Sequence, residues 1–170
     1  MSTEMSVVGF LPLAPEHLEL LHGWLQQPHV RAFWDDGHRT LEQVQQHYFE
    51  PDPDGSSFVF TLVHRPLGYL QAYRVDPESE YGPWRSPQGE TWGIDLLLGE
   101  AADTGQGYGP QVIAAFLAFW KGARPELRRV LIDPDARNIR AIRAYRKVGF
   151  SGVREVLRPP VTLQILAAEV

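Results

Sequence analysis

The sequence contains no cysteine, which excludes disulfide bonds, thiolate metal ligands and a cysteine nucleophile. It has no apolar run near the roughly 18–20 residues that span a bilayer, and its N-terminus shows no basic-then-apolar signal pattern. Positive charge is also scarce, with 16 Lys and Arg against 21 Asp and Glu, which argues against a nucleic-acid-binding protein. We therefore expect a soluble, cytoplasmic protein with no membrane or nucleic-acid partner.

Metal-binding patterns are missing as well. The six histidines form no i,i+4 pair and no His-Glu-x-x-His motif, so we expect no metal site. What is present is ordinary globular composition, with 44% hydrophobic and 22% charged residues in 170. This length suits one domain with a sizeable core, and we expect residues 1–170 to form a single domain.

Charge is distributed unevenly along the chain. Residues 35–54 and 76–100 each carry six acids and one base, whereas residues 121–158 carry eleven bases and four acids. This asymmetry suggests a cationic partner near the first two stretches and an anionic partner near the last. The alternative is that these charges only solvate the surfaces of loops and helices.

The hydrophobic pattern predicts an α+β fold. Thr40 and Gln43 have the spacing of a capping box, which marks the start of one helix. Expected helices are Pro15–Gln27, one from Thr40, Gly107–Lys121 and Asn138–Val148, and expected strands are Phe58–Val63, Gly68–Val75, Glu90–Gly99, Arg128–Ile132 and one or two more up to Val170. The third helix should bury a stripe formed by Val112, Phe116, Phe119 and Trp120.

A glycine-rich turn is the strongest local signal. Thr104 to Gly109 reads Thr-Gly-Gln-Gly-Tyr-Gly between the strand ending in Leu96-Leu97-Leu98 and the third helix. Such glycines let successive backbone N–H groups face one concavity, and the helix N-terminus adds a positive dipole end, so the turn can bind a pyrophosphate. A glycine-rich segment can also be only a turn. The P-loop lysine is missing and the motif lies too late for a Rossmann site, which excludes both nucleotide-binding readings.

The strand, the glycine turn and the helix together resemble the acetyl-CoA signature of the GCN5-related N-acetyltransferases (GNAT). Downstream, Asn138, Ala141, Tyr145 and Gly149-Phe150 resemble the Asn-x-x-Ala-x-x-x-Tyr-x-x-x-Gly-Phe segment of that family at full spacing. One position departs: Thr104 stands where the family usually has Gln or Arg. The resemblance implies a GNAT fold, with a mostly antiparallel sheet, a parallel strand pair at the acetyl-CoA site and about four flanking helices.

Other residues narrow the likeness. Gly93-Ile94-Asp95, Asp133-Pro134 and Trp24-Leu25 leading to Trp34 resemble the aminoglycoside 6′-N-acetyltransferases. The likeness spans nearly the whole chain and is tightest from Gly93 to Phe150. Hydroxamate-siderophore acyltransferases share the Asp-Pro-x-x-Arg-Asn run, but they generally have a histidine where this chain has Asp95.

The resemblance assigns roles to residues of this sequence. Acetyl-CoA, as co-substrate, is expected to contact Leu97, Leu98, Gly105, Gln106, Gly107, Tyr108, Gly109 and Asn138. Asp95 is expected to bind the substrate ammonium and take its proton, Tyr145 to protonate the departing thiolate, and Trp34 and Asp133 to contact substrate. Each residue also has a structural alternative: Asp95 as a solvent-facing acid, Tyr145 as a core tyrosine, Asn138 as a helix cap.

The function predicted is direct transfer of acetyl from acetyl-CoA to a primary amine of a small polycationic substrate, an aminoglycoside first. Acids of the Asp35 and Glu78–Glu80 loops, with Asp95 and Asp133, would suit such a substrate. The alternatives are acylation of an N-hydroxylysine-type siderophore precursor and a CoA-binding regulatory module without catalysis. The expected assembly is a monomer or a homodimer.

Overall fold

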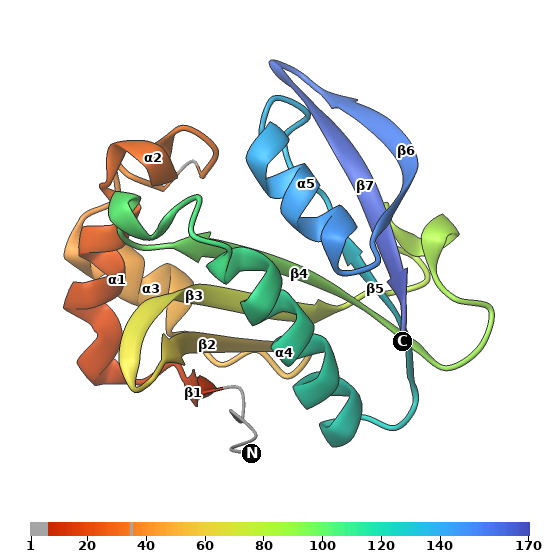
Figure 1. The fold of residues 1–170 in the computed structure, drawn as a ribbon, viewed down its shortest axis with the longest axis horizontal. Helices are drawn as coiled ribbons and strands as arrows, with labels where there is room; N and C mark the ends of the chain where they lie inside the picture. The colour runs from red at the N-terminus through yellow and green to blue at the C-terminus, as the bar shows by residue number, and fades with distance from the viewer. Residues whose placement is uncertain (1–6, 35) are drawn as a thin grey trace. The chain divides into compact units, whose positions relative to one another are not determined.

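The computed structural model describes residues 7–34 and 36–170. The strands of this part form one mixed sheet in the order β1-β2-β3-β4-β5-β7-β6 (Figure 1). They are β1 (Val8–Pro12), β2 (Gly55–Leu62), β3 (Arg65–Arg74), β4 (Glu90–Leu98), β5 (Leu127–Ile132), β6 (Ser151–Arg158) and β7 (Val161–Glu169). Strands β4 and β5 run parallel, while β1–β2, β5–β7 and β6–β7 are antiparallel. The predicted α+β class and parallel pair are confirmed.

Five α-helices accompany the sheet in the described part of the chain, one more than expected because α2 is a single additional turn. They are α1 (Leu18–Leu25), α2 (Pro28–Arg31), α3 (Leu41–Tyr48), α4 (Tyr108–Ala123) and α5 (Ile139–Lys147). Three 3₁₀ turns are η1 (Pro15–His17), η2 (Gly82–Trp84) and η3 (Ala101–Asp103). Within the described residues, every helix is too short or too polar to cross a membrane.

The chain divides into two compact units. The first contains the described residues up to Gln71 together with Leu96–Tyr108, and the second contains Ala72–Asp95 and Gly109–Val170. Both β3 and β4 contribute residues to each unit. The glycine-rich turn up to Tyr108 belongs to the first unit, and Asp95, Asp133 and Tyr145 belong to the second.

In the first unit, α1 and α3 lie side by side (Figure 1). Helix α3 starts as its sequence predicts, because the Thr40 hydroxyl accepts a hydrogen bond from Gln43 N and the Gln43 side chain accepts one from Thr40 N. The apolar faces of these helices meet β2 and β3 in a core cluster whose buried members are Leu21, Trp24, Leu25, Val30, Val44, Tyr48, Val59, Tyr69 and Leu97. Burial of this face, more than intrinsic helix propensity, stabilises such short helices.

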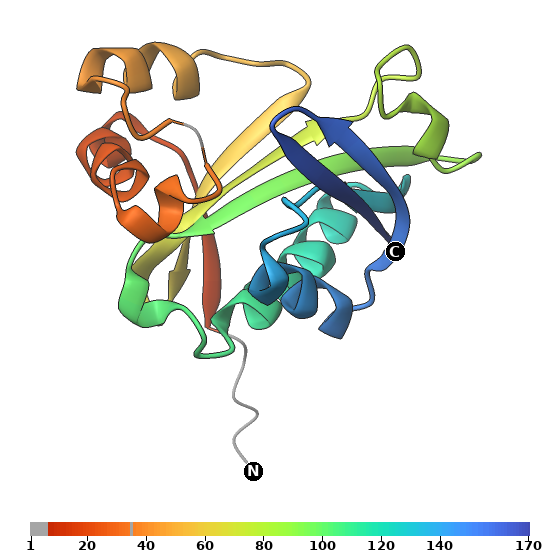
Figure 2. The ribbon, with the colours of Figure 1, turned by 90° about the horizontal axis from the view of Figure 1, so that it is seen from above.

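In the second unit, α4 begins against α5, since a Cβ added at Gly109 would lie 3.8 Å from that of Ala144 (Figure 2). Helix α4 buries Val112, Ile113, Phe116 and Trp120. Phe119 is 41% exposed, so its predicted place in the buried stripe is wrong. Phe119 follows Phe116 by three residues and precedes Trp120 by one, which leaves its side chain at the margin of the buried face.

Element ends differ by a few residues from the sequence prediction. Pro15 begins a 3₁₀ turn that leads into α1, and the helix stops at Leu25 before Pro28 opens α2. Strand β1 was not predicted. It has five residues, and it is held by antiparallel pairing of Val8 with Leu62 through Pro12 with Phe58.

Candidate active site

The glycine-rich turn has the backbone geometry that a phosphate-binding turn requires. Gly105 and Gly107 have φ of 73° and 82°, values that residues with a Cβ rarely adopt. A Cβ added at Gly107 would meet no atom within 4 Å, so the glycine is required by conformation and not by crowding. Gly107 is followed at once by α4, whose first N–H groups have no partner within the helix. An anion can bind such a turn.

The end of strand β4, which leads into this turn, is held in place by several contacts. Leu97 is 6% exposed and belongs to the core cluster of the first unit. The carbonyl of Leu98 accepts a hydrogen bond of 2.8 Å from Nε2 of His29. At Gly99 the backbone passes the Trp24 ring so closely that a Cβ would lie 2.2 Å from it. The position of the strand end is therefore fixed by side chains of α1 and α2.

Two carboxylates meet in the second unit at the parallel strand pair. Gly93 of β4 pairs with Leu131 of β5, so Asp95 and Asp133, each two residues farther on, come side by side on one face. A hydrogen bond with Asp95 is one of the interactions that act on the Asp133 carboxyl. Two carboxylates this close do not both ionise readily, because their like charges repel each other.

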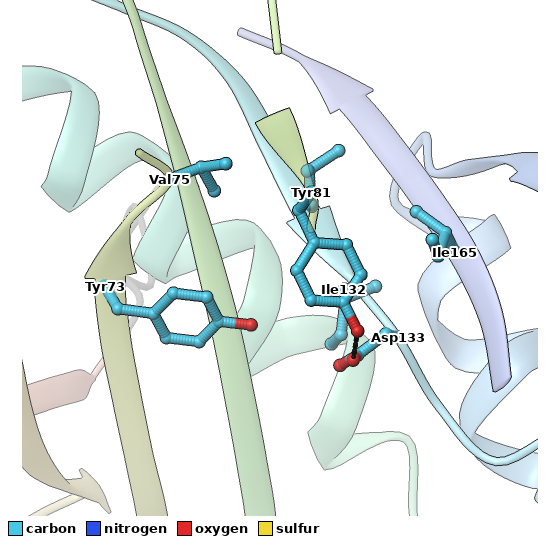
Figure 3. A pocket seen from close by; sticks show the side chains of 7 residues that line it. Tyr73, Val75, Tyr81, Ile132, Asp133 and Ile165 are labelled. Carbon is cyan, nitrogen blue, oxygen red and sulfur yellow. Dashed lines mark hydrogen bonds between the residues drawn. The ribbon is translucent and has the colours of Figure 1, made fainter. Parts of the chain in front are cut away.

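Asp133 is held by a chain of polar contacts from two other segments. The Tyr81 hydroxyl donates a 2.5 Å hydrogen bond to Asp133 Oδ2 (Figure 3). Arg158 at the end of β6 donates to the Tyr81 hydroxyl at 3.1 Å, and it also binds the carboxylate of Glu80. Its guanidinium lies 5.5 Å from the Tyr81 ring centroid. The loop 76–89 is thereby attached to the β6–β7 hairpin at the carboxylate.

Tyr73 completes the same pocket. Its hydroxyl is directed toward the side of the pocket where Tyr81 and Asp133 lie (Figure 3). Its ring covers Gly93, where an added Cβ would come within 2.2 Å of a ring carbon. Gly93 is thus required so that a tyrosine can lie across β4 two residues before Asp95.

Burial raises the pKa of Asp133 and of the three tyrosines around it. Burial raises the pKa of Asp133, and the Tyr81 hydrogen bond, the Arg158 charge and Asp95 oppose it without cancelling it. Burial and the Asp133 hydrogen bond raise the pKa of Tyr81. Burial, then the negative charge of Asp95 and Asp133, raises the pKa of Tyr73 and of Tyr145. The three phenols therefore keep their protons at neutral pH, and that of Tyr81 donates to Asp133.

Tyr145 and Asn138 occupy the positions predicted on α5. Tyr145 is 7% exposed, and its ring lies 6.1 Å from that of Phe150. Asn138 caps α5 through a 3.3 Å hydrogen bond from Ala141 N to its Oδ1. Asp135 has a structural role in the turn before α5, because it accepts hydrogen bonds from the backbone and side chain of Arg137. The cap confirms one of the two roles considered for Asn138, and its contact with the cofactor stays a prediction.

Trp34 lies in the first unit, where a structural role already explains it. Its Nε1 donates a 2.9 Å hydrogen bond to the Tyr48 hydroxyl, and its ring is edge-on to Tyr69 at 6.1 Å. Tyr48 in turn donates to Asp36, which also forms an ion pair of 2.7 Å with Arg39. Substrate contact by Trp34 remains a prediction.

The acids predicted to attract a polycation are less free than the sequence suggested. Asp36 is bound by Tyr48 and Arg39, and Glu80 by Arg158, while Glu78 is exposed. Asp35 lies outside the described residues. Of the predicted substrate residues, the structure brings together Asp95 and Asp133 in the second unit.

Sequence reasoning missed Tyr73, Tyr81 and Arg158. The contact of Tyr81 with Asp133 spans 52 positions and that of Arg158 with Tyr81 spans 77. No local pattern marks residues that meet at such separations. The one available signal was Gly93 in an otherwise bulky strand, since a glycine there indicates the close approach of another group.

Comparison with known proteins agrees with this geometry. The chain matches the acetyltransferase (GNAT) domain family over residues 14–157. It is 32% identical over 156 residues to aminoglycoside N(6′)-acetyltransferase type 1 of Klebsiella pneumoniae, covering 88% of this chain and 77% of that protein, and equally similar to the protein of that name from Serratia marcescens.

Solved structures of related enzymes superpose on nearly the whole chain. AAC(6′)-Ib in complex with paromomycin and acetyl-CoA gives a TM-score of 0.83 at 26% identity, covering 95% of this chain and 93% of that one. The spermidine N-acetyltransferase of Vibrio cholerae gives a TM-score of 0.79 at 11% identity over 97% of this chain and 96% of that one, a likeness of fold alone. With its family match over residues 14–157 and these relatives, the chain belongs to the GNAT acetyltransferases.

Proposed function

We propose that this protein transfers the acetyl group of acetyl-CoA directly to a primary amine of an aminoglycoside or a similar small polycation. The observation that carries the proposal is the contact between Asp95 and Asp133 at the parallel strand pair. A substrate ammonium can bind between them, and its charge favours the ionised form of both carboxylates. The relatives named for aminoglycoside acetylation, one of them in complex with kanamycin, support this substrate class.

Acetyl-CoA binds through the first unit in this proposal. The backbone N–H groups of Gly105 to Tyr108 and the start of α4 hold the pyrophosphate, and the end of β4 at Leu97 and Leu98 contacts the pantetheine arm. The short side chain of Thr104 does not contact the pyrophosphate in this proposal, because its hydroxyl donates a 2.6 Å hydrogen bond to the carbonyl of Ala101.

The chemical step needs a neutral amine and a stabilised leaving group. Asp95, directly or through water, takes one proton from the ammonium, and the amine nitrogen then attacks the thioester carbonyl carbon. As the C–N bond forms and the C–S bond breaks, the C–S electron pair leaves on sulfur, and Tyr145 gives its hydroxyl proton to the thiolate. The second proton that leaves the nitrogen, directly or through water, restores the Tyr145 phenol and gives a neutral amide. The amine's charge offsets Asp95 and Asp133, which counteracts the electrostatic part of the rise in the pKa of Tyr145. Substrate binding thus makes Tyr145 a better acid.

The test is release of free thiol from acetyl-CoA with a panel of amines. Kanamycin should react faster than N-hydroxylysine or a monoamine with an uncharged body, and added salt should weaken the polycation most. Faster acylation of N-hydroxylysine would move the assignment to siderophore-precursor chemistry. Binding of acetyl-CoA without acetylation of any amine would instead identify a regulatory module.

A further inference from the structure

The hairpin between β2 and β3 turns through two strained residues. Val63 and His64 have φ of 48° and 65°, the pattern of a type I′ turn that Asn and Gly ordinarily fill. Valine is branched at Cβ and is strongly disfavoured at positive φ. Its side chain is 62% exposed, so burial of that side chain does not offset the strain. Backbone outliers of this kind are often retained where they hold a neighbouring group in place.

That neighbouring group is Arg65, the first residue of β3. Its Nη1 and Nη2 donate to Oδ2 and Oδ1 of Asp103, both at 3.0 Å, so the pair is bidentate. Asp103 is 8% exposed and is one of three buried polar or charged residues in the described ranges. The hydrogen bond to Asp103 raises the pKa of Arg65, and the nearby phenol of Tyr108 and the carboxylate of Glu100 add to this rise.

Asp103 stands directly before the glycine-rich turn. It ends the 3₁₀ turn η3, and two residues later the backbone turns through Gly105 at positive φ. Upstream, the backbone is fixed at Leu98 by His29 and at Gly99, whose N–H donates to the Leu67 carbonyl at 3.0 Å. The bidentate pair is therefore a side-chain anchor at the other end of this short connection.

The charge of Asp103 would oppose an anionic ligand if it were not compensated. A pyrophosphate at Gly105 to Tyr108 would lie a few residues from a buried carboxylate, where screening by water is weak. Arg65 places both of its terminal nitrogens on that carboxylate and neutralises it. The Arg65 side chain itself is half exposed, so its charge lies at the surface beside the turn.

We propose that Arg65 is a positioning residue for the phosphate-binding turn: it anchors Asp103 and cancels its charge so that the pyrophosphate of coenzyme A can bind. This inference rests on the proposed function, since it takes acetyl-CoA as the ligand of the turn. It assigns the strained Val63–His64 turn the role of presenting Arg65. The effect is confined to the phosphate end of the cofactor.

Binding of coenzyme A and of pantetheine, which lacks the phosphates, tests this directly. Titrations followed by NMR measure both dissociation constants for the wild type, Arg65→Gln, Asp103→Asn and the double variant. For Arg65→Gln we expect the constant for coenzyme A to rise at least about tenfold, because a buried charge loses its partner beside the ligand. The constant for pantetheine should change by less than about twofold. The double variant should recover most of the lost affinity.

Two controls separate positioning from general structural damage. Val63→Asn with His64→Gly fits the turn geometry and should leave both constants unchanged while raising thermal stability. Arg65→Lys keeps the charge but loses the bidentate contact and should fall between wild type and Arg65→Gln. Equal weakening of both ligands, or a double variant no better than Arg65→Gln, would overturn the inference. Coenzyme A binding without acetylation of any amine contradicts the proposed function alone, whereas acetylation with unaltered binding in Arg65→Gln contradicts this inference alone.

Discussion

Each unit of the molecule contains a tyrosine that donates a hydrogen bond to an aspartate, yet the two aspartates differ. In the first unit Tyr48 binds Asp36, and in the second Tyr81 binds Asp133. Burial alone would raise the pKa of Asp36, but Tyr48 and Arg39 outweigh it and the pKa lies below its ordinary value of 3.8. For Asp133 burial wins, and its pKa lies above that value.

The difference comes from burial and from the nearest cation. Asp36 has Arg39 in direct contact at 2.7 Å, whereas burial dominates at Asp133, which faces a second carboxylate, Asp95, and reaches Arg158 only through Tyr81. In the first pair, the arginine neutralises the aspartate, so the carboxylate needs no further partner. A pair that faces another acid lacks a positive charge, and a substrate ammonium can supply it. A tyrosine–aspartate pair therefore stabilises the fold in one unit and takes part in the proposed chemistry in the other.

The largest expected effect is that of Tyr145→Phe, which removes the donor for the thiolate. We expect kcat to fall about 10²-fold, within the range typical of general acid catalysis, with acetyl-CoA affinity nearly unchanged. Tyr48→Phe is the matched control, because it removes a buried phenol from the structural pair. Thiol release at saturating substrates measures both. An unchanged kcat for Tyr145→Phe, in an enzyme whose chemical step limits turnover, would assign Tyr145 to the core.

The next effect separates the two aspartates by substrate charge. Asp133→Asn should raise KM for multiply charged amines by an amount equivalent to about 1–3 kcal/mol, because a charge-assisted hydrogen bond in a desolvated pocket is lost. Asp36→Asn should leave KM within about twofold. Steady-state kinetics with kanamycin and with a monoamine measures KM for both variants. An equal rise for both variants would show that neither pair is specialised.

Sequence reasoning succeeded where the cause is local. The Thr40–Gln43 capping box, the end of β4 in the glycine turn and the Asn138 cap each depend on residues a few positions apart. It failed for β1, whose five residues are ordered by pairing with β2, and for Phe119, whose exposure depends on where the helix face ends.

The residues of the candidate site also differ in whether local sequence could predict them. Asp95 and Asp133 were predicted because motifs surround them, and the sheet register then brings them together. Tyr81 and Arg158, which lower the pKa of Asp133 against the effect of burial, lie on a loop and a strand far away in sequence. The neutralisation of Glu80 could not be predicted either, because its ion pair with Arg158 forms across 78 positions.

Stability should respond with opposite signs at the two aspartates. Because the folded pKa of Asp36 is lowered, its carboxylate contributes stability above pH 3.8 that is lost as pH falls through the folded value. The raised pKa of Asp133 makes its ionised form unfavourable at neutral pH, a penalty that disappears as pH falls toward 3.8. At pH 7, Asp36→Asn should lower the unfolding free energy by about 1 kcal/mol, while Asp133→Asn should leave it unchanged or higher. Denaturant unfolding at pH 7 and pH 4 measures both, and a loss at Asp133 equal to that at Asp36 would refute the contrast.

The smallest effect should be that of Tyr81→Phe on the pH profile. The Tyr81 hydroxyl lowers the pKa of Asp133, so its removal raises that pKa further and moves the acid limb of kcat/KM to higher pH. Arg158→Gln should move the limb in the same direction, since it removes a positive charge that also lowers the pKa of Asp133. Tyr48→Phe should leave the limb in place, because Asp36 takes no part in binding the amine. On the plateau above the acid limb the rates of all three variants should stay within about threefold of the wild type, since the same carboxylate is ionised there in each. If Tyr48→Phe and Tyr81→Phe moved the acid limb equally, the pH profile would report overall stability. That result would refute the role in amine binding proposed for Asp133.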